Sequence, residues 1–228
     1  MHPLEFRNRW RIRSHINGVM LRNISQVYRY MDQYWIDEFF KTGNLQLTSF
    51  VKNRTVDDIR NDENEGYHDY IILSRDRTKQ SSIRFDDRDT HRMLCTSTEL
   101  DLNKYLPYFK VDGCFKINNP LGFGYEVAKV LKGFEKGQEG MTEYTDRGFS
   151  FFPLEKFPDL PDLTDNSPPI HELFPYLDMI PRVDFNMFYL KKTKYSPENE
   201  YRLIWKCERE HDLIINCPDA RKFCEKIT

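Results

Sequence analysis

The amino-acid sequence predicts an α+β fold: a split, mainly antiparallel β core with flanking helices. Segments with strand-like alternation outnumber segments with helical spacing, and the two kinds do not alternate regularly as they do in parallel α/β folds. The 17 Phe and 13 Tyr residues predict a core rich in aromatic side chains. At 228 residues the chain suits a single domain, which we expect over 23–228, preceded by a basic N-terminal arm over 1–22.

The first half of the chain is predicted to begin with a strand, a helix and a second strand. The helix is expected over 32–43, because apolar residues at helical spacing are followed by Gly43, a residue type that commonly ends helices. Polar and acidic residues indicate a loop over 51–69, and a charged segment at 75–90 joins two later strands. The segments with strand-like composition are 23–30, 44–50, 70–74 and 91–98.

The second half is predicted to open with a strand that changes into a helix within 114–134, with Pro120 and Gly124 near the junction. Seven prolines over 153–181 predict a loop-rich connection inside the domain, and a terminal helix is expected at 219–227. The remaining strands are expected at 141–152, 184–192, 198–208 and 212–217, with the second and third of these paired as a hairpin.

Composition and charge argue against several classes of protein. Positive and negative charges nearly cancel, leaving a formal net charge of −2, so no overall basic field indicates nucleic-acid binding. No apolar run approaches the ~18 residues of a membrane span, and the basic N-terminus is not followed by the apolar stretch of a secretory signal. Five scattered cysteines without a C-x-x-C pair indicate reduced thiols rather than disulfides or a zinc site, so we expect a cytoplasmic protein.

Two glutamates, Glu198 and Glu200, stand at alternate positions in the stretch ENEYRLIW. In a strand such residues point to the same face, and two neighbouring carboxylates raise the proton affinity of one of them. The pair suits chemistry at a sugar carbon, where one acid steadies an oxocarbenium-like centre and the other orients or deprotonates an acceptor. The alternative is an exposed strand whose polar positions continue with Arg202 and Lys206.

Two further segments carry candidate binding residues. Arg29 lies in the strand-like stretch VYRY, where a guanidinium needs an anionic partner: either a ligand's phosphate or carboxylate, or a structural acid. A later strand ends in three hydroxyl residues, Thr96, Ser97 and Thr98. Hydroxyls in a row can hydrogen-bond a ribose or fix a carboxylate, although β propensity and a cap before a turn explain the same residues without a ligand.

These segments follow one another in a meaningful order. An early arginine, a central row of hydroxyls and a late E-x-E resemble the Arg…Ser-Thr-Ser…Glu-x-Glu pattern of the ADP-ribosyltransferase superfamily. The chain is also similar to a bacterial family of domains of unknown function, through the stretches VYRY, LQLTSF with its acidic loop, CFKINNPLGFG and FYLKKTKYSPENEYRLIW. The resemblance covers residues 25–206. The hydroxyl row here reads Thr-Ser-Thr, and the intervals between motifs are longer than in compact toxins.

The resemblance implies a transferase that uses NAD as a substrate to modify a protein or nucleic acid, as a toxin or phage-defence effector with an inhibitor protein among its partners. Arg29 would hold the phosphates or ribose of NAD, and Ser97, with a neighbouring threonine, would brace the nicotinamide ribose. Glu200 would contact the ribose 2′-hydroxyl while the nicotinamide bond breaks, and Glu198 would act on the acceptor. The loop 52–66 would cover the site.

Other patterns allow functions of a different class. The N-terminal arm alternates arginine with Trp10 and Ile12, which suits phosphate contacts and base stacking, or a strand with its charges toward solvent. Its arginines are Arg7, Arg9, Arg11 and Arg13. A non-catalytic module that binds nucleic acid or protein is therefore a second hypothesis. A metal-dependent nuclease using the acids of 57–65 is a third, although the six histidines lack metal-ligand spacing; GFG at 122–124 is interpreted as a tight turn.

Overall fold

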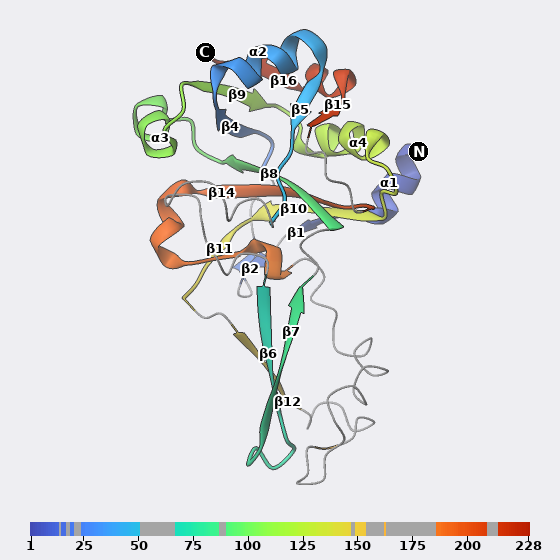
Figure 1. Ribbon diagram of the computed structural model, residues 1–228, viewed down its shortest axis with the longest axis vertical. Coiled ribbons are helices and arrows are strands. Elements are labelled where there is room, and N and C mark those ends of the chain that lie inside the picture. Colours follow the sequence, from blue (N-terminus) through green and yellow to red (C-terminus); the bar gives the residue numbers. More distant parts are fainter. Residues whose placement is uncertain are drawn as a thin grey trace.

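The computed structural model describes residues 1–13, 15–16, 19–20, 24–50, 67–86, 90–146, 149–153, 162, 186–208 and 214–228. At its centre lies a seven-stranded sheet with the order β1-β10-β14-β8-β4-β9-β16 (Figure 1). Neighbouring strands are antiparallel except for β1 and β10, which confirms the mainly antiparallel α+β class. The strands are β1 (Trp10–Arg13), β4 (Val27–Met31), β8 (His91–Ser97), β9 (Gly113–Ile117), β10 (Lys136–Met141), β14 (Glu200–Lys206) and β16 (Cys224–Lys226).

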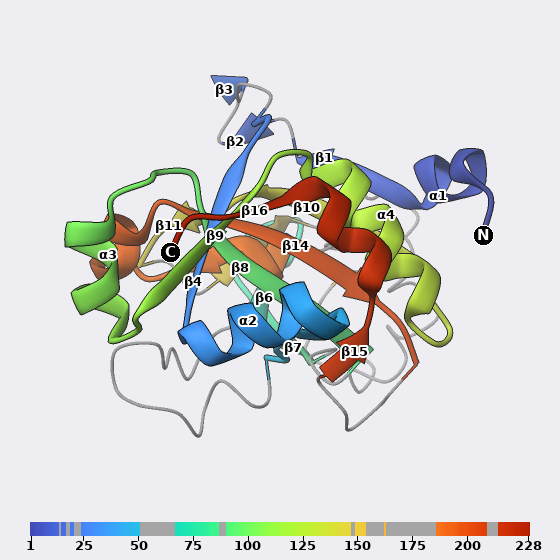
Figure 2. The same cartoon turned by 90° about the horizontal axis from the view of Figure 1, so that it is seen from above.

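The helices α1 (Pro3–Arg9), α2 (Gln33–Thr42) and α4 (Pro120–Val130) cover one face of this sheet, and the main hydrophobic core lies beneath them (Figure 2). Phe39 and Val127 from two of the helices pack in the same cluster as Trp205 of β14. On the opposite face, smaller clusters form around Tyr105 of α3 and Phe188 of η5. The bounds of α3 are Leu102–Phe109, and two 3-10 helices are η5 (Asn186–Tyr189) and η6 (Thr193–Glu198).

The prediction for α2 is confirmed in its spacing and in its end. Ile36 and Phe39 are buried on one side of the helix, and Gly43 adopts the left-handed conformation with φ of 87°. The Gly43 amide donates to Phe39 O at 2.8 Å and closes the last turn. A Cβ at Gly43 would lie 2.7 Å from the backbone of Pro218, so both the conformation and the available space require glycine here.

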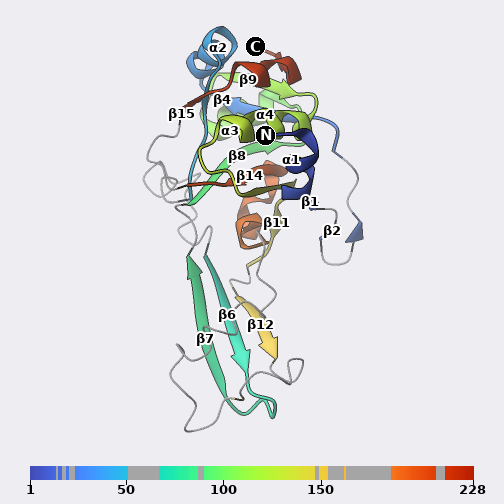
Figure 3. The same cartoon turned by 90° about the vertical axis from the view of Figure 1, so that its right-hand side faces the viewer.

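A second sheet, of order β12-β6-β7, extends away from the main sheet (Figures 1 and 3). Its strands are β6 (Tyr67–Leu73), β7 (Gln80–Asp86) and β12 (Phe149–Pro153). The prediction of 75–90 as a charged connection is therefore wrong over β7. Four of the charged residues of this segment lie in the turn between β6 and β7, where Asp76 Oδ1 accepts from Ser74 Oγ at 2.5 Å and from Thr78 N at 3.0 Å.

Two predictions for the last third of the chain are wrong. Segments 184–192 and 198–208 do not form a hairpin. η5 occupies much of the first segment, and β14, which lies in the second segment, pairs with β8 and β10. The helix expected at 219–227 is a 3-10 turn followed by β16, whose backbone pairs with β9. The remaining short elements are β2 (His15–Ile16), β3 (Val19–Met20), β5 (Asn44–Gln46), β11 (Glu143–Tyr144), β13 (Leu190–Lys191), β15 (Ile214–Asn216) and η7 (Pro218–Phe223).

The first 13 residues pack as part of the main domain rather than as a separate arm. Phe6 of α1 and Trp10 of β1 are buried and stack with ring centroids 4.9 Å apart. α1 lies beside α4 (Figure 2), and Tyr125 Oη of α4 donates to Met1 O at 2.9 Å. The proline-rich connection predicted at 153–181 lies, apart from Pro153 and Asp162, outside the described residues. In the described part of the chain, no helix is long and apolar enough to cross a membrane.

Candidate functional site

The three strands that carry the predicted site residues are neighbours at the centre of the main sheet. β4 carries Arg29, β8 carries Thr96 and Ser97, and β14 begins with Glu200. In the register of these strands Ser97 stands opposite Glu200 on one side and Tyr28 on the other. Because paired residues project to the same face of a sheet, Ser97 and Glu200 share a face.

Glu198 and Glu200 meet at one lysine. Lys191 Nζ of β13 lies 2.6 Å from Glu198 Oε2 and 3.2 Å from Glu200 Oε2. Arg202 completes the group with two contacts to Glu200, Nε to Oε1 at 3.0 Å and Nη2 to Oε2 at 2.9 Å. The two acids are together, as predicted, but not as strand neighbours, because Glu198 is the last residue of η6. We refer to Lys191, Glu198, Glu200 and Arg202 as the ionic cluster.

The ionic cluster is almost completely enclosed. The exposed fractions of the side chains are 6% for Lys191, 5% for Glu198, 4% for Glu200 and 0% for Arg202. Two positive and two negative side chains leave no net charge in the buried group. Each ion therefore loses its water but gains an opposite charge, the condition under which buried charges are tolerated.

The environment shifts the pKa values of the two carboxyl groups in opposite directions. Burial raises the pKa of Glu198, Lys191 acts in the opposite direction, and the charge of Glu200 raises this pKa further. Burial acts in the same sense on Glu200, but the charges of Arg202 and Lys191 outweigh it and hold the pKa of Glu200 well below its usual range. In enzymes, two neighbouring carboxyl groups whose pKa values are shifted in opposite directions can serve as a general acid and an ionised carboxylate.

Backbone contacts hold Glu200 in place. Its amide donates to Tyr144 Oη at 2.8 Å, and its carbonyl accepts from Thr142 N at 2.9 Å. Burial raises the pKa of Tyr144, and the charge of Glu200 raises it further, so this hydroxyl stays protonated. The carboxylate of Glu200 is thus attached to a backbone fixed from β10 and β11.

The predicted hydroxyl row contacts the protein's own chain. Thr96 Oγ1 donates to Tyr201 O at 2.7 Å, and Thr98 Oγ1 donates to Asn199 O at 3.4 Å. Ser97 Oγ accepts from Glu99 N at 3.2 Å, as in a local turn motif. Ser97, which is 1% exposed, is the residue of the row that stands opposite Glu200.

Arg29 departs from the predicted arrangement. Side chains alternate along β4, so Arg29 leaves the strand on the face of Val27 and Met31, which belong to the main core. Tyr28, opposite Ser97, projects to the other face and clusters with α3. Arg29 Nη1 donates to Cys95 O at 2.6 Å. The expectation that guanidinium, hydroxyls and acids line one hollow is therefore corrected: Arg29 lies on the face opposite Glu200.

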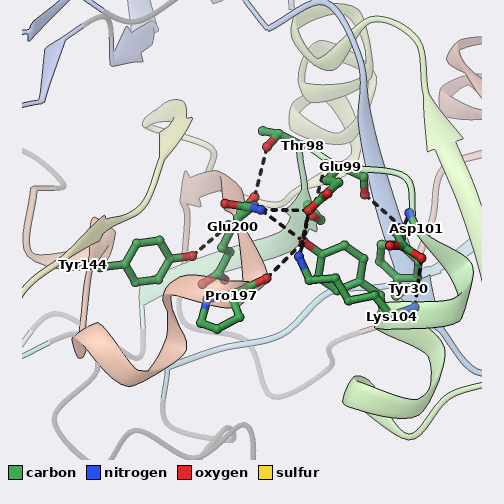
Figure 4. A network of polar contacts seen from close by, with 11 residues as sticks. Tyr30, Thr98, Glu99, Asp101, Lys104, Tyr144, Pro197 and Glu200 are labelled. Atoms are coloured by element: carbon green, nitrogen blue, oxygen red, sulfur yellow. Dashed lines mark hydrogen bonds and ion pairs between the residues drawn. The ribbon is translucent and has the colours of Figure 1, made fainter.

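A polar network at the end of β8 was missed from the sequence (Figure 4). Glu99 Oε2 accepts from Lys104 Nζ at 2.9 Å, Tyr105 Oη at 2.7 Å and Asn199 Nδ2 at 2.9 Å. Hydrogen bonds from Lys104, Tyr105 and Asn199 lower the pKa of Glu99 to about 2. The signal in the sequence was local: Asp101 caps α3 at Lys104 N, which aims the first turn of the helix back at Glu99.

Arginines of the N-terminal segment differ in burial and in their ion pairs. Arg9 pairs with Glu5 at 2.8 Å, and Arg13 pairs with Glu143 at 2.9 Å while its side chain is 9% exposed. Arg7 and Arg11 are exposed on α1 and β1. Among the described residues no group of three or more His, Cys, Asp or Glu side chains could hold a metal ion, and the acids of 57–65 lie outside that part.

Comparisons with protein-family models, with curated proteins and with solved structures find nothing that matches this chain.

Proposed function

We propose that the chain is an NAD-dependent ADP-ribosyltransferase that modifies a protein or nucleic acid, and that it serves as a toxin or phage-defence effector. The observation that carries this proposal is the order β14-β8-β4 at the centre of the sheet. It brings together three strands from distant parts of the chain, at 27–31, 91–97 and 200–206, which carry Arg29, the hydroxyls of Thr96 and Ser97, and Glu200.

The chemistry proposed for this site uses the different protonation states of Glu198 and Glu200. Glu200, held ionised, would steady the positive charge that develops on the ribose as the nicotinamide bond breaks. Glu198, whose raised pKa keeps a proton within reach of neutral pH, would exchange a proton with the acceptor. Ser97, opposite Glu200, would orient the ribose. The fit of NAD to these residues does not extend to Arg29, which lies on the other face, so we give Arg29 no phosphate contact.

The enzyme hypothesis is tested by nicotinamide release from NAD. We expect Glu200→Gln to lower the rate by at least about a hundredfold, because the swap keeps the size of the side chain and removes its charge. Since Glu200 pairs with two cations, circular dichroism must first show that the variant is folded. Ser97→Ala provides a second variant outside the ion pairs, and Glu225→Gln, an exposed acid on β16, is the matched control. Release at the wild-type rate by folded Glu200→Gln excludes the assigned role.

A measurement of NAD binding tests which face of the sheet forms the site. A specific ligand raises the melting temperature by mass action. We expect the NAD-dependent rise to disappear in Glu200→Gln and to persist in Arg29→Ala. The opposite result means that NAD contacts the face of Arg29.

A second candidate is a non-catalytic module that binds nucleic acid or protein. The enclosure of both glutamates in ion pairs favours it, because charges satisfied within the fold have no need of a ligand. Exposed Arg7 and Arg11 offer phosphate contacts. Binding of an oligonucleotide that is indifferent to NAD, falls steeply with salt and weakens in Arg7→Ala favours this candidate over the transferase.

A further inference from the structure

The residue between the two glutamates has an unusual backbone. Asn199 ends η6 in the left-handed conformation, with φ of 46° and ψ of 48°, and β14 begins at the next residue. L-residues other than glycine rarely adopt this conformation, and asparagine is among those that tolerate it best. The direction in which Glu198 leaves the chain relative to Glu200 depends on this turn.

Contacts from two other elements hold the turn. The backbone of Asn199 is fixed from β8, since Asn199 O accepts from Thr98 N at 3.0 Å. Its side chain donates to Glu99 Oε2 at 2.9 Å and to Tyr105 Oη at 3.3 Å. Tyr105 Oη, whose proton is donated to Glu99, also lies 3.1 Å from Pro197 O, the carbonyl of the residue before Glu198. Figure 4 shows Glu99 and Lys104 on one side of this turn and Tyr144, which contacts the backbone of Glu200, on the other.

Glu99 is the acceptor on which this arrangement depends. A single oxygen of its carboxylate receives the hydrogen bonds of Lys104, Tyr105 and Asn199. A charged acceptor forms stronger hydrogen bonds than a neutral one. Glu99 therefore links β8, α3 and the left-handed turn, and it stays outside the ionic cluster with a side chain 45% exposed.

We propose that Glu99 is a positioning residue: through Asn199 it sets the left-handed turn that directs Glu198 and Glu200 at the same lysine. The inference rests on the proposed function in so far as the aimed carboxylates do chemistry. The link between Glu99, Asn199 and the ionic cluster is a property of the fold and can be measured without any substrate.

The experiment follows the titration of Glu198 by carbon NMR of labelled glutamate carboxyls, together with nicotinamide release. Glu99→Ala and Asn199→Gly are the test variants, because glycine permits the left-handed conformation without strain but lacks the side chain that holds the turn to Glu99. We expect each to lower the titration midpoint of Glu198 by roughly one pH unit as water reaches the loosened turn. Nicotinamide release should fall by about tenfold or more in kcat with little change in KM.

Coupling and conservative rescue distinguish positioning from general loss of stability. The double variant should shift the titration no further than either single one, because both remove the same link. Glu99→Gln keeps an acceptor for Asn199 and should recover part of the effect. Glu225→Ala removes an exposed ion pair of 2.6 Å at the far edge of the sheet and should leave Glu198 unchanged.

Each outcome decides one of the two ideas. An unchanged midpoint in folded Glu99→Ala, or additive shifts in the double variant, overturns the positioning role. If the midpoint of Glu198 shifts in Glu99→Ala but the wild-type protein releases no nicotinamide, the positioning role is supported and the proposed transferase is excluded. A shifted midpoint together with lowered kcat supports both.

Discussion

Glu139 provides a sharp test of the electrostatics of the main core. It lies in the middle of β10, opposite Ile12 of β1 and Leu203 of β14, and it is 3% exposed. Its Oε2 has no hydrogen-bond partner in the described part of the chain. Burial outweighs the opposing effect of Trp10 and Tyr201 and raises the pKa of this carboxyl from 4.5 to about 8, so the folded protein carries it protonated at neutral pH.

The sign of the pH dependence follows from linkage. Below pH 4.5 the carboxyl is protonated in both the folded and the unfolded chain and has no effect on stability. As the pH rises toward 8, the unfolded chain ionises Glu139 and the folded chain does not, so the free energy of unfolding falls by about 1.4 kcal/mol per pH unit. The accumulated loss is about 3 kcal/mol at pH 7.

We expect Glu139→Gln to remove this slope. Urea unfolding of the wild type and the variant between pH 5 and pH 8 should give stability differences that change by about 1.4 kcal/mol per pH unit in favour of the variant. A constant offset from the buried amide does not affect the slope. Met141→Leu, a neutral change on the same face of β10, should instead shift the whole curve in parallel. Parallel curves for Glu139→Gln mean that the carboxylate is ionised inside the fold, and the argument is wrong.

Two further changes test the packing and the ionic cluster by urea unfolding at pH 7. Lys191→Met leaves Glu198 and Glu200 buried without their shared cation, and we expect a loss of about 3–5 kcal/mol; a loss near zero would mean that water already reaches them. Gly137→Ala places a Cβ 2.2 Å from the ring of Trp10, and we expect a loss of about 3 kcal/mol; a fully stable variant would place that ring elsewhere.

Features set by neighbouring residues were predictable from the sequence. The helix α2 ends at Gly43 because a single residue supplies the left-handed conformation, and β14 follows from its own composition. The strand β7 was missed because charged residues occur along the whole of 75–90, and the turn built around Asp76 holds only some of them. The turn itself is formed by local contacts, but the residues after it form a strand because they pair with β6.

Features set by the register between distant strands were not predictable. Whether Arg29 shares a face with Glu200 depends on which residue of β4 stands opposite Ser97, and the sequence contains no signal for that pairing. The partners of the two glutamates were missed for the same reason, since Lys191 reaches them from a strand paired with β11. The sequence indicated the residue types of the site, and the sheet register determines which of them meet.

The order of strands in the main sheet also governs how fast the protein folds. β8 pairs with β14, although Ser97 and Glu200 are separated by about half of the chain, and β10 must be inserted between β14 and β1. Such non-local pairing requires large loops to close, and the entropy cost of closure comes before any stabilising contact forms. The folding rate is therefore limited by topology. We therefore expect refolding from urea to be slow, on the order of seconds rather than milliseconds.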